Sequence, residues 1–475
     1  MIEPGSALDT ALQWLLVSER ELLVFAAFWF CVGLVDEFAL DCLWLWLKLT
    51  GRAKTRRLRP GHGTGPLASP AAVLIPAFQE STVIGATVAY MLRVWPQQEL
   101  RIYVGCYAND PATLAAASQA AGSDPRVRLV VHGARGPTTK ADCLNRLYLA
   151  LRQDEARGAL RFGSVILHDA EDMVHPAALS VIDTELTRCD FVQLPVRAEL
   201  QPSSRWIGAH YADEFAESHA KAMVVRDAMG AALPAAGVGC GFSRTALARL
   251  EERRANEGLS GPFAPESLTE DYELGLMLSR EGRGSRFLRL RDSAGQLVAT
   301  RSYFPADLAS AVRQKTRWVH GIAFQGWERM GWSARPIELW MALRDRRGPL
   351  TALVLAAAYL LLAVDAVLLA AHLAGWRGDL TLSPALRLML MLSLAGFVWR
   401  AGLRGLFTAR EYGWREGVRG ILRIPVGNII AIMAGRRALA AYMRSLRGEA
   451  VVWDKTVHQH HPAAIVPHQL EEVRA

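Results

Sequence analysis

Cysteines are few in this sequence, and none is placed as part of a pair. The six cysteines are scattered over 475 residues without a C-x-x-C spacing, so neither a disulfide framework nor a zinc site is indicated. His458, His460 and His461 have no acidic or thiol partner in the pattern, and we interpret them as a polar tail. The soluble part is therefore expected in a reducing, cytosolic setting.

A secretory signal is also missing. Such a signal places basic residues before a short apolar core and small residues at a cleavage site after it. The first apolar stretch, from about Glu21 to Leu49, has the reverse order, because the basic sequence GRAKTRRLRP follows it. We expect a retained membrane helix with its N-terminus outside. Its carboxylates Asp36, Glu37 and Asp41 imply a partner, a polar cavity or a break into two shorter helices.

The charge distribution does not favour nucleic-acid binding, although the formal net charge is +8. Most of the basic excess flanks apolar runs, which is typical of the cytoplasmic ends of membrane helices and of contacts with anionic lipids. The composition, 51% hydrophobic and 21% charged, indicates a mixture of soluble and membrane parts. A lipid bilayer is therefore the expected partner, and nucleic acid is the weaker alternative.

Two more membrane spans are expected late in the sequence, from Pro349 to Ala374 and from Leu386 to about Leu406, joined by an outside loop. A third apolar segment, Ile421 to Met433, is short for a span, which needs about 20 apolar residues. We expect it to lie along the interface or to pack against the soluble domain.

Between these regions, short apolar strands alternate with helical patterns. The expected strands are 71–76, 101–107, 127–132 and 164–168, with helices at 81–94 and 140–152 among others. This alternation predicts an α/β domain with a largely parallel sheet, whose ligands bind at the carboxyl ends of the strands. The expected division is an N-terminal membrane helix region at 1–50, a basic linker at 51–70, the α/β domain at 71–335, membrane and interface helices at 336–447, and a cytoplasmic tail at 448–475.

Several candidate ligand-binding residues follow the first two strands. Pro76, Phe78 and Glu80 come at the end of the first strand, where backbone amides and a carboxylate would surround a ligand. Asp110 follows the second strand and would accept hydrogen bonds from a uracil or ribose, or would cap the next helix. Lys140 begins a helix and would face a phosphate, or would be a solvated surface lysine.

Three acids within four residues follow the fourth strand. Asp169, Glu171 and Asp172 would repel one another, and a hard divalent cation held by oxygen ligands would relieve that repulsion. Mg²⁺ or Mn²⁺ there could bridge the protein to a diphosphate and neutralise a leaving group. The alternative is a set of turn and helix-cap acids, but the uniformly apolar strand before them favours the metal interpretation.

The triplet Thr269, Glu270 and Asp271 opens a helical pattern. Asp271 would lie in the first turn, where backbone amides stabilise its ionised form and it could take a proton from a sugar hydroxyl. A capping box would explain Thr269 and Glu270 at least as well.

In the stretch QKTRW, helical spacing places Gln314, Arg317 and Trp318 on one face. The Trp ring could stack on a sugar and the Arg could hold a diphosphate, whereas an interfacial anchor is the alternative.

In this order the motifs resemble those of the family 2 membrane glycosyltransferases, which include cellulose and hyaluronan synthases. The segments PAFQE, YANDPAT, HDAEDMVHP, QKTRWVHGIAFQGW and WDKTVHQHHP are similar to those of the phage-adsorption protein B group in that family. The resemblance implies a GT-A fold, an α/β, Rossmann-like nucleotide-sugar-binding domain on the cytoplasmic side, with α-helical transmembrane segments at both ends. It also implies inversion at the anomeric carbon.

By motif, the resemblance assigns Asp110 to the nucleotide and Asp169 with Glu171 to the metal, leaving open whether Glu171 or Asp172 is the second metal-side acid. It makes Asp271 the base, with Glu270 beside it. Pro76, Phe78, Glu80, Lys140 and Asp169 are expected to bind the nucleotide sugar, and Gln314, Arg317 and Trp318 to hold the acceptor and diphosphate.

The implied function is transfer of a sugar from a nucleotide-diphosphate sugar, a UDP-sugar by preference, to a growing exopolysaccharide at the bacterial inner membrane. Transfer of one sugar to a lipid phosphate and a non-catalytic receptor for phage adsorption are the alternatives. Expected partners are the nucleotide sugar, a glycan acceptor and the bilayer, with an outer-membrane export partner or a second copy of the chain as further candidates.

Overall fold

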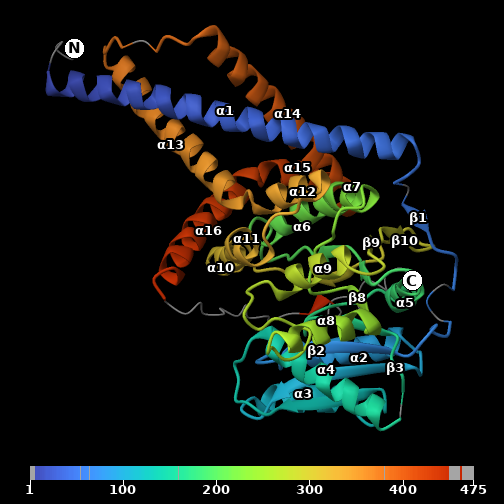
Figure 1. Cartoon of the computed structure of the whole chain (residues 1–475). Helices are drawn as coiled ribbons and strands as arrows, with labels where there is room; N and C mark the ends of the chain where they lie inside the picture. The colour runs from blue at the N-terminus through green and yellow to red at the C-terminus, as the bar shows by residue number, and fades with distance from the viewer. Residues whose placement is uncertain are drawn as a thin grey trace.

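The computed structural model describes residues 6–53, 55–61, 63, 65–158, 160–378, 380–448 and 461–462. An α/β domain forms one end of the molecule and long helices form the other, with a layer of shorter helices between them (Figure 1). His458 and His460 lie outside the described residues.

A seven-stranded sheet in the order β4-β3-β2-β5-β8-β6-β9 forms the centre of the α/β domain. β2 pairs in parallel with β3 and β5, and β3 with β4, but β8 runs antiparallel to both β5 and β6, so the sheet is mixed. The strands are β2 (Ala71–Pro76), β3 (Leu100–Tyr107), β4 (Val127–His132), β5 (Ser164–Leu167), β6 (Phe191–Gln193), β8 (Cys240–Ser243) and β9 (Ser285–Phe287).

Both faces of the sheet are covered, which explains why its inner strands are apolar without alternation. Val73 and Ile75 of β2 pack into one core cluster with α2 (Ile84–Val94), α3 (Pro111–Ala121) and α5 (Ala178–Leu186). Ala72 and Leu74, which point to the other face, pack with α4 (Lys140–Ala156) and α8 (Arg244–Asn256). The domain is therefore a three-layer α/β/α arrangement.

Small strands and short helices complete the domain. In the segment expected to be a linker, β1 (Arg56–Arg57) pairs with β10 (Leu290–Arg291), so this segment is attached to the domain. The others are β7 (Val196–Ala198), β11 (Thr300–Ser302), α6 (Ala209–Glu217), η1 (Ser218–Ala222), α7 (Met223–Ala228), α9 (Glu270–Arg280), α10 (Leu308–Val319), η2 (His320–Gln325), α11 (Gly326–Met330) and α12 (Pro336–Arg346).

Four helices are long and apolar enough to cross a membrane in the part of the chain that the structure describes. They are α1 (Ala7–Leu49), α13 (Gly348–Leu373), α14 (Pro384–Tyr412) and α16 (Ile424–Ser445). The helix α1 is unbroken over 43 residues and begins at Ser6, whose side chain accepts from the Asp9 amide. The alternative of two shorter helices is therefore wrong.

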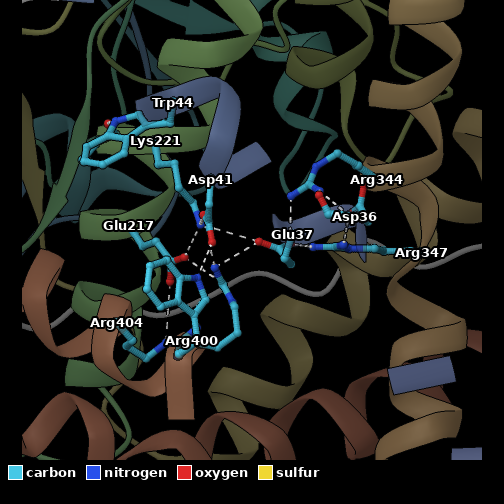
Figure 2. Close-up of polar contacts among 12 residues, drawn as sticks. Asp36, Glu37, Asp41, Trp44, Glu217, Lys221, Arg344, Arg347, Arg400 and Arg404 are labelled. Atoms are coloured by element: carbon cyan, nitrogen blue, oxygen red, sulfur yellow. Dashed lines mark hydrogen bonds and ion pairs between the residues drawn. The ribbon is translucent and has the colours of Figure 1, made fainter. Parts of the chain in front are cut away.

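The carboxylates of α1 find their partners inside the protein (Figure 2). Asp36 and Glu37 pair with Arg344 and Arg347, and Asp41 pairs with Lys221 at 2.5 Å. Glu37 also forms an ion pair with Arg400 of α14, at 3.1 Å, and so lies between the two halves of the cluster. The ion cluster, as we call it, consists of Asp36, Glu37, Asp41, Glu217, Lys221, Arg344, Arg347, Arg400 and Arg404.

The segment expected at 421–433 belongs to α16, which continues to Ser445 through Arg436 and Arg437. Its length makes it a candidate span, and it packs both on α13, where Gly435 lies against Ala352, and on the α/β domain. Ile430 is fully buried in a cluster with Val312 of α10, and Tyr442 donates to Glu328 of α11 at 2.6 Å. The amphipathic helix before it, α15 (Trp414–Leu422), leaves Trp414, Val418 and Leu422 exposed.

Candidate active site

A cavity of about 510 Å³ opens at the carboxyl ends of β2 and β5, between the sheet and the layer of shorter helices. Almost every residue that the sequence singled out lines this cavity. They are Pro76, Phe78, Glu80, Lys140, Asp169, Glu171, Asp172, Glu270, Asp271, Gln314, Arg317 and Trp318. The fold thus brings together five segments that are separated by up to 240 residues in sequence, as expected for a parallel sheet edge.

Asp110 is the exception, because it does not line the cavity. Its carboxylate caps α3 by accepting from the Thr113 amide at 3.3 Å and also accepts from the Gln79 amide at 2.5 Å. Gln79 has a φ of 54°, in the left-handed region, so Asp110 stabilises a strained loop. This loop carries Phe78 and Glu80 to the cavity wall. Direct contact between Asp110 and a nucleotide stays a prediction.

Lys140 is held in the site and is not a solvated surface lysine. It follows Thr139, which forms a capping box with Asp142 and fixes the start of α4. The Lys140 ammonium lies 2.5 Å from Asp169 Oδ1. Burial lowers the pKa of Lys140, but the carboxylates of Asp169, Glu270 and Asp271 raise it above its ordinary value, so the side chain is charged.

The three acids after β5 are placed differently. Asp169 is one-third exposed, whereas Asp172 is buried and its Oδ2 accepts from the Asp169 amide and lies 2.9 Å from His168 Nδ1. Asp172 therefore stabilises the turn, and its backbone carbonyl is contacted by buried His461 at 3.3 Å. His461, which we interpreted as part of a polar tail, is instead buried against the α/β domain.

Asp169 and Glu171 remain as the two carboxylates that suit a metal. Among the described residues no group of three or more His, Cys, Asp or Glu side chains forms a metal site made by protein alone. Magnesium, however, is commonly held by one or two carboxylates together with substrate phosphates. The acidic surroundings of Lys140 leave an excess of negative charge, so the residues present fit a divalent cation.

Asp271 lies in the first turn of α9, as predicted, and faces the cavity. Its Oδ1 accepts from the Tyr272 amide at 2.8 Å. A Cβ at Gly237 would lie 2.3 Å from Asp271 Oδ2 and 3.1 Å from Lys140 Nζ, so only glycine, here with a φ of +73°, fits between them. The Thr269 side chain makes no cap hydrogen bond, and so the capping-box alternative is wrong.

The two acids of this triplet hold protons more tightly than free carboxyls do. Burial raises the pKa of Glu270 to about 8, with Asp271 adding to the effect and Lys140 opposing it. Burial also raises the pKa of Asp271, against the lowering effect of Lys140. Carboxyl groups whose pKa is raised by burial and by neighbouring charges are typical of functional sites.

Gln314, Arg317 and Trp318 share one face of α10 and line the cavity together. The Trp318 ring packs edge-on against Tyr211 with centroids 6.0 Å apart. Gln314 Oε1 is buried and has no hydrogen-bond partner among the described residues. These contacts place Trp318 inside the protein, which argues against the interfacial anchor.

The sequence reasoning missed the end of the cavity that faces the long helices. Its wall includes Arg226 of α7 and Met341, Arg344 and Asp345 of α12. These residues follow no strand and belong to no motif, and α12 lay in the region assigned to membrane and interface helices. Only their charge, next to apolar sequence, could have drawn attention to them.

Residues 69–321 match the profile described as glycosyltransferase like family 2. This chain belongs to that family. Together with the mixed sheet and the acidic motifs at its edge, the match confirms the expected GT-A fold.

Two curated relatives match along nearly the whole chain. They are bacteriophage adsorption protein B of Escherichia coli strain K12 and bacteriophage N4 adsorption protein B of Escherichia coli O157:H7. Each is 32% identical over 478 residues, which cover 95% of this chain and 63% of the relative. This chain therefore spans less than two thirds of the length of these relatives.

Solved structures of glycosyltransferases are also similar. A mannosyltransferase of Pyrobaculum calidifontis with GDP-Man and Mn²⁺ is 18% identical, with 88% of this chain and 99% of that chain covered and a TM-score of 0.49. Glucosyl-3-phosphoglycerate synthase of Mycobacterium tuberculosis with Mn²⁺, UDP and phosphoglyceric acid is 16% identical, with 56% and 79% covered and a TM-score of 0.35.

Proposed function

We propose that this protein is an inverting glycosyltransferase of the bacterial inner membrane that transfers a sugar from a nucleotide-diphosphate sugar, a UDP-sugar by preference, to a growing exopolysaccharide. The observation that carries the proposal is the grouping of Asp169, Lys140 and Asp271 on one wall of the cavity. The face of α10 that carries Gln314, Arg317 and Trp318 lines the same cavity.

In the proposed reaction, Asp271 takes the proton of an acceptor hydroxyl as that oxygen bonds to the anomeric carbon of the donor. The bond between the anomeric carbon and the diphosphate breaks, and the nucleoside diphosphate leaves from the opposite side. Lys140 and Arg317 stabilise the charge that develops on the diphosphate. A divalent cation, when held by Asp169 and Glu171, would supply further neutralisation of the leaving group.

The proposed orientation places the sheet and the cavity in the cytoplasm. Basic residues follow α1 and precede α13, as the positive-inside rule requires for cytoplasmic ends. We assign three crossings, α1, α13 and α14, and place α16 beside the catalytic domain because both its middle and its end contact α10 and α11. Three crossings are few for an export channel, so a second copy or an outer-membrane partner is proposed to complete the path.

The proposal is tested by sugar transfer with purified protein in detergent. UDP-glucose, UDP-GlcNAc, UDP-galactose and GDP-mannose are each supplied with Mn²⁺ or Mg²⁺, and transfer is expected from one donor only when the metal is present. Asp169→Asn combined with Glu171→Gln should abolish it, and Glu252→Gln, at an exposed position of α8, should not. Activity that persists after full chelation would contradict the metal assignment.

The enzyme and the receptor alternative are separated by Asp271→Asn. Loss of the base should lower turnover by about 10²-fold or more and leave nucleotide binding nearly unchanged. Nucleotide binding is measured by the rise in melting temperature with ligand. If neither the wild type nor the variant transfers any sugar, the chain is a non-catalytic partner.

The length of the product separates polymer synthesis from single transfer. A lipid-linked monosaccharide as sole product would exclude polymer synthesis.

A further inference from the structure

The helix α12 makes contacts in two directions through consecutive residues. Arg344 donates to Asp36 and Glu37 of α1 and so belongs to the ion cluster. Asp345 points to the catalytic domain, where both of its oxygens accept from Arg226 at 2.8 and 2.9 Å. Successive side chains of a helix diverge by about 100°. A single turn of α12 therefore connects the N-terminal membrane helix to the wall of the cavity.

The second contact of Asp345 reaches the residue next to the proposed base. The Tyr272 hydroxyl donates to Asp345 Oδ2 at 2.8 Å, and the Tyr272 ring is buried at 5% exposure. Burial, together with Asp345, raises the pKa of Tyr272 well above its ordinary value, so the hydroxyl stays a donor. The Tyr272 amide in turn donates to Asp271 Oδ1 at 2.8 Å.

These contacts leave Asp271 with little freedom. One carboxylate oxygen is fixed by the Tyr272 amide, and the other lies against Gly237 and near Lys140. A small rotation of the first turn of α9 would move both. Two side chains of this turn are anchored outside α9: Glu273 accepts from Arg329 at 2.9 Å and from Ser267 at 2.8 Å, and the Tyr272 hydroxyl donates to Asp345. Tyr272 is the residue next to Asp271 and its amide holds Asp271 Oδ1, so its hydrogen bond to Asp345 restrains the rotation at the base itself.

We propose that Asp345 is a positioning residue, which acts through the Tyr272 hydroxyl to hold the proposed base Asp271 at the angle needed for proton removal. The inference rests on the proposed function. It assigns a role in the transfer step to α12, which follows the Q-x-x-R-W helix and lies outside the residues matched by the family profile.

The test is the transfer kinetics of Tyr272→Phe, which removes one hydroxyl and no ring volume. We expect kcat to fall about 10-fold, because displacement of a catalytic group by a fraction of an ångström is costly. The KM for the nucleotide sugar should stay within about 2-fold, because the donor-binding residues are unchanged. Asp345→Asn, which keeps an acceptor oxygen, should retain more activity than Asp345→Ala. Adding Tyr272→Phe to Asp345→Ala should cause no further loss.

The matched control is Tyr412→Phe. The Tyr412 hydroxyl also joins a long helix to the catalytic domain, by donating to the Ala198 carbonyl at 2.7 Å, but it lies away from the cavity. An equal loss of kcat in this control would overturn the inference, and so would an unchanged kcat in Tyr272→Phe with the wild type active. A wild type that transfers no sugar would overturn the proposed function and this inference with it. If Asp345→Ala does not fold, Tyr272→Phe decides alone.

Discussion

Lys140 is the cation around which the carboxylates of the cavity are arranged. It lowers the pKa of Asp271, whereas burial raises it. A general base must be ionised, so transfer should be lost as the pH falls through this raised pKa and should return as the pH rises. Without the ammonium the carboxylate is harder to ionise.

Lys140→Met should therefore move the acid limb of the kcat/KM profile to higher pH, in addition to lowering the rate. Arg253→Met on α8, whose partner Glu281 is exposed, should leave the limb in place. An acid limb at the same pH in Lys140→Met and wild type would show that a group other than Asp271 is titrating.

Trp318 offers a second test at this scale. We expect Trp318→Ala to weaken acceptor use and to shorten the products, because the ring lines the cavity and is proposed to stack on the acceptor sugar. Trp318→Phe should recover part of the loss. Product length is measured by gel electrophoresis after limited reaction. Products of normal length from a poorly expressed Trp318→Ala protein would assign the residue to packing against Tyr211 instead.

Single residues were predictable where a motif coincides with the end of a strand, as for Asp169, or with the start of a helix, as for Asp271. The sequence could not decide between Glu171 and Asp172 as the second acid beside Asp169, because the choice depends on which carboxylate turns inward to His168. It left open whether Asp110 binds a nucleotide or caps α3, and it gave no sign that Asp110 also holds the Gln79 loop. Asp345 was missed because its partners, Tyr272 and Arg226, are 73 and 119 residues away.

The carboxylates of α1 are neutralised by cations from other elements of the fold. Lys221 is 2% exposed and its ammonium lies 2.5 Å from Asp41 and 2.8 Å from Glu217. Lys221→Met should lower the free energy of unfolding by roughly 3–5 kcal/mol, because it leaves buried carboxylates with fewer cations. Thermal unfolding in detergent measures this. The double variant Lys221→Met, Asp41→Leu should recover part of the loss, whereas an additive loss would contradict the pairing.

Element boundaries were predictable for the short apolar runs of β2 and β4 and for the start of α4, where a capping box begins the helix. The extent of α16 was not, because Arg436 and Arg437 interrupt the apolar pattern while the helix continues. The reversed strand β8 could not be predicted either, since a four-residue strand carries no signal of its direction. The direction of a strand depends on the edge of the sheet at which the chain enters it, and the residues of the strand do not encode that edge.

For the whole molecule, the fold class and the membrane helices at both ends followed from sequence, but the connections between the two parts did not. Besides the ion cluster, Arg423 at the start of α16 binds Asp213 of α6 with two hydrogen bonds of 2.7 Å, and both side chains are buried. Such long-range pairs have no local signature. They make the position of the cavity relative to the long helices a fixed property of the fold.

The core cluster shared by α6, α10 and α16 has a consequence for how this protein can be divided. The family match ends at residue 321, yet Tyr211 and Val312 are covered by Ile430, more than 100 residues further along the chain. A fragment of residues 55–335, which lacks both α1 and α16, should therefore aggregate in the same detergent in which the full chain stays monodisperse, as size-exclusion chromatography would show. The segment that matches the family profile is therefore shorter than the segment needed to cover the core of the catalytic domain.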